Sequence, residues 1–427
     1  VDLPPLPRLD FNDPSKLRLT AFFALVTVVL FAVLAIATIQ GFEFSESTAF
    51  CGEVCHVPME PEHTAWQQSP HARVRCVECH VGSGLDYYVK AKINGTRQLY
   101  SVLTGTYPTP IPTPVHNLRP ARGACERCHW PEKFISSRYK VFSHNAPNEE
   151  NTHREVQMLI KIGGTPGAPN SSGIHWHIGN EVSYVATDEK RMNIPYISEK
   201  TNDGSLDEFF SIDKPLSKEV AAINEKRLMD CIDCHNRPAH SYNPPSDELD
   251  HAFEAGKLDP ALPFLKKIAV DLLEKPYKSK EEAMAAINRG VNDYYSKNYP
   301  ALAKSKDASI KQAFEEIQRI YSRNFFPKMK VVWSAYPSHM GHFYFPGCFR
   351  CHDGKHRNAA GKFISKDCNL CHSVISQIQE NIPKGKQVKN FVHPVDIGDE
   401  MMKTNCSDCH TPGGADVTGG ESEKKKH

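Results

Sequence analysis

The chain has 427 residues and is almost neutral, since 51 lysines and arginines against 50 aspartates and glutamates give a formal net charge of +1. This balance excludes the strongly basic surface of a typical nucleic-acid-binding protein, so we expect no nucleic acid partner. The fourteen cysteines fall into seven closely spaced pairs, a pattern typical of cofactor or metal binding and not of a disulfide framework.

The first predicted element is a membrane-spanning helix over residues 19–42. Its apolar core, residues 19–39, carries no charge, and at about 1.5 Å per residue it spans about 30 Å, the thickness of a bilayer core. A cleaved signal peptide is the alternative, but its apolar core is shorter, about 7–15 residues. Basic residues precede the run and acidic residues follow it, so the positive-inside rule places residues 1–18 in the cytoplasm and the bulk of the chain in the periplasm.

Seven short motifs follow the predicted anchor. Six read C-x-x-C-H, and the first has one extra residue between its cysteines; they comprise Cys51, Cys55 and His56; Cys76, Cys79 and His80; Cys125, Cys128 and His129; Cys231, Cys234 and His235; Cys348, Cys351 and His352; Cys368, Cys371 and His372; and Cys406, Cys409 and His410. In such a motif the two thiols attach a haem covalently and the histidine ligates its iron. Zinc also binds C-x-x-C pairs, but it does not require a histidine directly after each pair. We therefore predict seven covalently bound haem c groups.

Fourteen of the 21 histidines lie outside the motifs, which is the surplus expected if most irons have a second histidine ligand. A histidine close to a motif is badly placed to reach the far face of the same haem, so we expect it to ligate a neighbouring haem. The predicted ligands of this kind are His71, His116, His240, His356 and His393. One of His175 and His177, and one of His339 and His342, are also predicted ligands.

The segments between the motifs differ in pattern. Short β-like runs at 156–162, 182–186 and 194–197 are separated by glycine and proline, and residues 261–275 and 310–321 carry apolar residues at a helical spacing of three to four. The expected fold is a multihaem cytochrome c, mostly α-helical and irregular around stacked haems, with one N-terminal transmembrane helix and a small β-rich insert. The predicted segments are a cytoplasmic N-terminus (1–18), the anchor (19–42), a first haem domain (43–139), the β-rich insert (140–230), a fourth-haem segment (231–245), a helical insert (246–330), a C-terminal haem domain (331–415) and a disordered tail (416–427).

Residues 47–135 resemble the NapC/NirT (NrfH-like) family of membrane-anchored multihaem quinol dehydrogenases, in Ser47-Thr-Ala-Phe-Cys51, Met59-Glu-Pro-Glu62, Ser69-Pro-His71 and the first three motifs. In that family a methionine shortly after the first motif, and not the motif histidine, ligates the first haem. The resemblance therefore implies Met59 as this ligand, three residues after His56 where the family has two. The alternative is that His56 ligates the iron and Met59 only packs beside it.

The resemblance also implies a quinol site beside the first haem. The family uses a lysine at the place of Lys92, which lies 12 residues beyond His80, and Lys90 is close by. The acidic residue that the family has shortly afterwards is replaced by Gln98, and Asp86 is another candidate. A cation near a quinone oxygen favours the anionic form, and a nearby carboxylate can accept the proton. The alternative role of both lysines is contact with anionic lipid headgroups.

These features predict an inner-membrane protein that passes electrons from the quinol pool through its haems to a periplasmic cytochrome or reductase. The C-terminal half resembles larger heptahaem relatives, some of which accompany Rieske and cytochrome b subunits. The alternative is therefore a non-catalytic, electron-conducting subunit of a bc-type complex, in which a partner oxidises the quinol. A multihaem reductase is a third possibility, but it requires an open iron, and the sequence contains no C-x-x-C-K motif.

Overall fold

The computed structural model describes residues 13–82, 84–115, 120–163, 173–201, 203–383, 388 and 390–410. The predicted ligand His116 and the predicted tail at 416–427 lie outside these residues.

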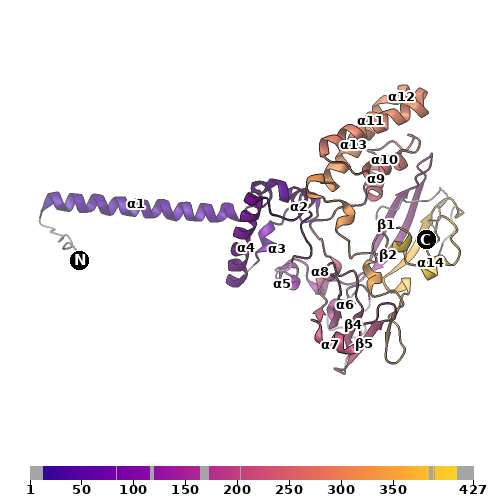
Figure 1. Ribbon diagram of the computed structural model, residues 1–427, viewed down its shortest axis with the longest axis horizontal. Helices are drawn as coiled ribbons and strands as arrows, with labels where there is room; N and C mark the ends of the chain where they lie inside the picture. Colours follow the sequence, from indigo (N-terminus) through magenta and orange to yellow (C-terminus); the bar gives the residue numbers. More distant parts are fainter. Residues whose placement is uncertain are drawn as a thin grey trace.

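The N-terminal helix α1, Pro14–Ser45, projects alone from the rest of the molecule (Figure 1). It begins where the Asp13 carboxylate accepts a hydrogen bond from the Ser15 N–H at 2.9 Å and where Pro14 occupies the first helical position. Its apolar side chains are exposed, and within the described chain it is the one helix long and apolar enough to cross a bilayer. The predicted long apolar helix is therefore confirmed.

Short helices carry the first three haem motifs at the end of α1. They are η1 Phe50–Val54, α2 His56–Gln68, α3 Cys76–His80, α4 Leu85–Thr104, α5 Ala121–Cys125 and η2 Pro131–Lys133. Figure 1 shows α4 lying across the end of α1, with α2 and α3 beside it. The apolar-aromatic stretch after the second motif is thus a single 20-residue helix at the place where the anchor leaves the membrane.

Two small antiparallel sheets follow. Strands β1 Ser137–Asn145, β2 His153–Lys161 and β8 His372–Ile378 form one, in the order β1-β2-β8. The other has the order β6-β3-β4-β5-β7 and consists of β3 Val182–Val185, β4 Tyr196–Lys200, β5 Leu206–Ser211, β6 Arg227–Leu228 and β7 His356–Asn358. The predicted β-like runs are confirmed in β2, β3 and β4. However, the predicted insert does not form these sheets alone, because β7 and β8 come from the C-terminal haem segment. These two strands pair with β5 and β2, whose edge backbone groups would otherwise be left without partners.

The helical stretch forms its own apolar core. Its elements are α9 Pro245–Glu254, α10 Leu265–Leu273, α11 Lys280–Asn298, α12 Pro300–Ser305, α13 Asp307–Asn324, η3 Pro327–Met329 and η4 Trp333–Ala335. Leu265 and Ile317, both predicted core positions, are fully buried in it. Ala65 from α2 joins the same core, so the helical stretch is docked on the first haem segment. Packing among the helices themselves, and not against haem alone, accounts for these apolar stripes.

The remaining elements carry haem motifs and their connections. They are α6 Trp176–Gly179, α7 Lys218–Ile223, α8 Cys231–Cys234, η5 Gly347–Arg350, η6 Cys368–Leu370, α14 Glu400–Lys403 and α15 Cys406–Cys409.

A buried ion pair anchors α10 to α9 and generates a stability prediction. The Lys266 side chain is 1% exposed, its Nζ lies 2.6 Å from Asp250 Oδ1, and it donates to the Ser246 carbonyl at 2.8 Å. Asp250→Ala leaves this ammonium buried without its carboxylate, which should cost about 3–5 kcal/mol. Limited proteolysis should then cleave the helical stretch much faster than in the wild type. Lys280→Ala, which breaks an exposed pair with Glu60, is the control and should be neutral; equal cleavage of the two variants would contradict the prediction.

Candidate haem sites and quinol site

The haem motifs adopt single tight turns. In four of them the backbone N–H of the histidine donates to the carbonyl of the first cysteine, at 2.8–3.0 Å; these histidines are His129, His235, His352 and His410. Such a turn places both thiols and the imidazole on one side of the backbone. That is the arrangement needed to hold the edge of a porphyrin and its iron together.

The first motif accommodates the extra residue between its two cysteines by forming a wider turn. Phe50–Val54 forms a π-helical turn, which takes one more residue per turn than an α-helix. The ring of His63 packs closely against Gly52 within this turn. A side chain at position 52 would not fit, since its Cβ would lie 2.5 Å from the His63 ring carbon Cδ2. His56 begins α2, but its side chain lies outside the described part of the structure, and Met59 is half-buried on the same helix. His63 was not predicted; its signal in the sequence is its position two helical turns after His56.

The other six motif histidines each face a second histidine. The ring centroids lie 5.8–6.3 Å apart in the pairs His80 and His240, His129 and His71, His235 and His175, His352 and His177, His372 and His342, and His410 and His393. A metal–nitrogen bond is about 2 Å long and an imidazole centre lies about 1 Å beyond its nitrogen, so two imidazoles on opposite sides of one metal ion have centroids about 6 Å apart. The observed pairs therefore fit an iron with two axial histidines.

Backbone carbonyls orient most of these second histidines. The Nδ1 atoms of His71, His177 and His393 lie 3.1, 2.8 and 2.7 Å from the carbonyl oxygens of Pro238, Ile174 and Val395. A carbonyl only accepts, so in His71 and His177 Nδ1 carries the proton and Nε2 is left with the lone pair that a metal needs. Nδ1 of His393 also lies 3.2 Å from the Val395 N–H, so its contacts fix the position of the ring and not its tautomer. Such outer contacts hold a ligand ring at the correct angle.

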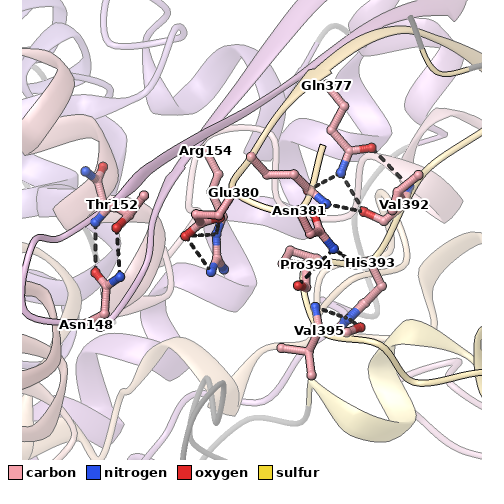
Figure 2. A network of polar contacts seen from close by, with 12 residues as sticks. Asn148, Thr152, Arg154, Gln377, Glu380, Asn381, Val392, His393, Pro394 and Val395 are labelled. Atoms are coloured by element: carbon pink, nitrogen blue, oxygen red, sulfur yellow. Dashed lines mark hydrogen bonds and ion pairs between the residues drawn. The ribbon is translucent and has the colours of Figure 1, made fainter. Parts of the chain in front are cut away.

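Figure 2 shows how the β2-β8 sheet holds the His393 segment. Gln377 at the end of β8 accepts from the Val392 N–H at 3.0 Å and donates to the Val392 carbonyl at 2.6 Å. Asn381 donates to the carbonyls of His393 and Pro394, both at 3.1 Å. The strand that follows the sixth motif thus positions the histidine that faces the seventh.

Two predicted ligands are engaged elsewhere. His356 is 2% exposed, and its Nδ1 and Nε2 lie 2.9 and 2.7 Å from the Asp353 carboxylate and the Ile194 carbonyl. Burial opposes its charge, but these acceptors raise its pKa, as expected of an imidazolium that donates twice. His339 has its two ring nitrogens near the carbonyls of Asp233 and Lys190. The geometry therefore opposes a ligand role for His356, and of His339 and His342 it brings only His342 to a motif histidine.

Consecutive motifs lie next to one another throughout the chain. The thiols of Cys51 and Cys76 are in hydrogen-bond contact, which lowers the pKa of Cys76 to about 6, and Cys125 and Cys231 are in the same kind of contact. Other pairs are close enough for the charge of one thiolate to raise the pKa of its neighbour: Cys79 and Cys125, Cys234 and Cys348, Cys348 and Cys371, and Cys368 and Cys406. The seven motifs thus succeed one another in space in the order of the sequence.

Side chains within the motifs also connect neighbouring sites. Arg350, inside the fifth motif, donates to the carbonyl of Asp233, inside the fourth, at 2.7 Å. Phe349 stacks on His342 with centroids 4.4 Å apart, and Phe343 stacks on His410 at 4.3 Å. The segment from 339 to 352 therefore contacts the last four sites at once.

Lys92 connects α4 to the end of α1. Its Nζ donates to Ser45 Oγ at 3.0 Å and lies 3.6 Å from Glu46 Oε1. It also lies over the rings of Phe42 and Tyr88, at 5.5 and 5.2 Å from their centroids. The Cys76 thiol, and then burial, raise the pKa of Cys51 well above its usual range, and the Lys92 ammonium partly offsets this. Lys92 therefore lies between the membrane anchor and the first haem motif.

The other predicted quinol-site residues point elsewhere around the helix. Asp86 and Gln98 are each six positions from Lys92, which is about 120° around α4, and Lys90 is about 160° away. All three are exposed. The acidic group beside Lys92 is Glu46, which comes from the anchor; it was missed because its proximity to Lys92 depends on how α1 meets α4.

An apolar anchor and a file of haem-attachment turns in one chain define a class, the membrane-anchored multihaem c-type cytochromes. Residues 14–112 match the N-terminal region of the NapC/NirT cytochrome c family. The chain is 60% identical over 424 residues to the cytochrome c-type protein ImcH of Geobacter sulfurreducens, covering 99% of this chain and 84% of that protein. It is 33% identical over 78 residues to the cytochrome c-type protein NrfH of Wolinella succinogenes, covering 18% of this chain and 44% of that protein.

This chain belongs to the NapC/NirT cytochrome c family, as the resemblance predicted. No solved structure matches it.

The paired rings predict which histidines control spin state. Alanine in place of His71, His175, His177, His240, His342 or His393 should each convert one low-spin haem to a high-spin haem, because one axial ligand is lost. His356→Ala is the matched control and should leave all haems as they were. Electron paramagnetic resonance of the loaded protein measures the change, and a high-spin signal from the His356 variant would restore that residue to the ligand set.

A carboxylate contacts His240, the histidine that faces His80. Nδ1 of His240 lies 3.1 Å from Glu62 Oε2 and 3.0 Å from the Glu62 carbonyl, and Arg237 holds the same carboxylate at 3.0 Å. A carboxylate behind a ligating histidine makes it more basic and favours the oxidised metal. Glu62→Gln should therefore raise one haem potential, by about 59 mV for a tenfold change in the one-electron equilibrium. Spectroelectrochemical titration checks this; the exposed Glu60→Gln is the control, and seven unshifted potentials would contradict it.

Proposed function

We propose that this protein takes electrons from membrane quinol at its first haem and conducts them through a single file of seven haems to a soluble acceptor in the periplasm. When bound, each haem supplies a one-electron redox centre. The observation that carries the proposal is the position of Lys92, which lies between the end of α1, an aromatic pair and the first haem motif.

The proposed ligand set supports conduction over small-molecule reduction. Six irons would have two histidines each, the pairs His80 and His240, His129 and His71, His235 and His175, His352 and His177, His372 and His342, and His410 and His393. Such an iron has no open position for a substrate. The first haem would differ, with Met59 or His56 on the side of α2. A methionine ligand raises the haem potential, which suits a site that receives electrons.

The α4 helix would lie in the headgroup plane beside the anchor. Leu85, Ile93, Tyr100 and Leu103 are 66–77% exposed along it, although large apolar side chains in water are unfavourable. An amphipathic helix in the membrane surface buries such a stripe in the headgroup and acyl boundary. Because Lys92 attaches α4 to the end of α1, the stripe and the anchor can enter the same bilayer surface. A quinol head arriving from the bilayer would meet Lys92 there.

The exit would be the seventh haem. Figure 1 places α14, which lies next to the last motif, at the end of the molecule opposite α1. Cys368 and Cys409 are exposed, as are Cys79 and Cys128, so the distance of the last motif from the anchor, and not exposure, makes the seventh haem the proposed exit. The order of the motifs in space then defines the direction of flow, from the membrane outward.

The Lys92→Ala variant tests electron entry. Removal of the ammonium takes away the group that stabilises the deprotonating quinol oxygen, so quinol-driven haem reduction should fall at least tenfold, while dithionite still reduces all seven haems. Stopped-flow absorption of the purified chain in nanodiscs measures both. Arg97→Ala, an exposed cation on the same helix, should reduce normally. A Lys92 variant with the wild-type rate would favour the rival in which Rieske and cytochrome b partners oxidise quinol.

A further inference from the structure

An acidic residue at the C-terminal end of the anchor helix, Glu46, faces the proposed quinol site. Glu46 is the C-cap of α1, and its Oε1 lies 3.6 Å from Lys92 Nζ. Its side chain is only 18% exposed, whereas that of Lys92 is 35% exposed. It lies seven residues beyond the apolar run, or about 10 Å farther along the helix axis. That depth is the headgroup region, where the polar end of a quinol would be.

The contact is more ordered than an ordinary surface ion pair, which contributes little to stability. Ser45 Oγ accepts from the same ammonium, and the stacked rings of Phe42 and Tyr88 lie beneath it. Three groups therefore hold one lysine beside one carboxylate, next to a cysteine of the first haem motif. A purely structural clamp between α1 and α4 would not require this position.

We propose that Glu46 is the proton acceptor for quinol oxidation at this site; the inference rests on the proposed function and assigns a second residue to it. A quinol O–H bond breaks and an O–H bond forms on the Glu46 carboxylate. Lys92 keeps its proton and exchanges one anionic partner, the carboxylate, for another, the quinol oxygen. The net charge of the site does not change in this step. That matters because isolated charge is costly in a weakly polar environment.

The electrons and protons then leave by different routes. The quinol loses two electrons, which pass one at a time to the first haem, and two protons, which pass in turn to Glu46. Because Glu46 is partly exposed at the C-terminal end of α1, it returns each proton to water on the side of the membrane that holds the haems. The product is the quinone, and both the carboxylate and the ammonium end in their starting states.

The test compares four variants of the full-length, haem-loaded protein in nanodiscs with a soluble menaquinol analogue. Glu46→Gln keeps the size and polarity of the side chain but cannot accept the proton. We expect its kcat for quinol-driven haem reduction to fall about 100-fold, with KM within about twofold. Binding of a fluorescent hydroxyquinoline N-oxide, a quinol mimic, should be unchanged. Glu43→Gln, an exposed acid one turn earlier on α1, is the matched control and should have the wild-type rate.

Haem content and helix content of each variant are measured first, since Glu46 also contacts α4. Glu46→Asp keeps a carboxylate and should recover part of the lost rate; an Asp variant no faster than the Gln variant overturns the proposal. Loss of the mimic's binding in Glu46→Gln overturns it as well, because Glu46 would then only shape the site. If Glu46→Gln is fully active and Lys92→Ala is not, the acceptor is another group and quinol oxidation stands. If both are fully active, the proposed function itself fails.

Discussion

Six motif histidines each face a second histidine at the spacing that an iron between them would require, and these pairings govern how the chain is arranged. In four of the six pairs the second ring lies at least 58 residues from the first in the sequence. His240 lies 160 residues after His80, and His177 lies 175 residues before His352. Each such pair would act as a crosslink through iron. These links would help a chain with few residues per haem to hold its shape, together with a large apolar core in the helical stretch, smaller apolar clusters on the five-stranded sheet, and sheets completed by remote strands.

The same requirement sets the distance between neighbouring sites. His175 and His177 are two residues apart and face the fourth and fifth motif histidines, so a short piece of backbone would fix the separation of two irons. Arg350 and Phe349 extend this from the fifth motif to the fourth and sixth sites.

The end of the molecule that carries the anchor combines an ion pair with exposed apolar surface. The exposed stripe of α4 and the apolar length of α1 both present large apolar side chains at the surface, and the pair of Lys92 and Glu46 lies where the two helices meet. A cation and an acid in contact at that depth can exchange partners with a quinol without creating net charge. The first haem motif differs from the others in its π-turn, and it is the motif nearest the end of the anchor helix.

The sequence by itself indicated the haem-attachment motifs, the anchor and the family. Haem attachment and membrane crossing each need a short, contiguous run of residues, which can be recognised without knowing the fold. It named His71, His240 and His393, each of which faces a motif ring, but it expected only one of His175 and His177 where both do, and it could not separate His342 from His339 or dismiss His356. Those assignments depend on which segments converge in the fold, and a histidine that ligates iron has the same local pattern as one that donates to a carbonyl. Only the tertiary structure gave the spatial order of the haem motifs and the contact of Glu46 with Lys92. Both depend on contacts between elements that no local sequence pattern reveals.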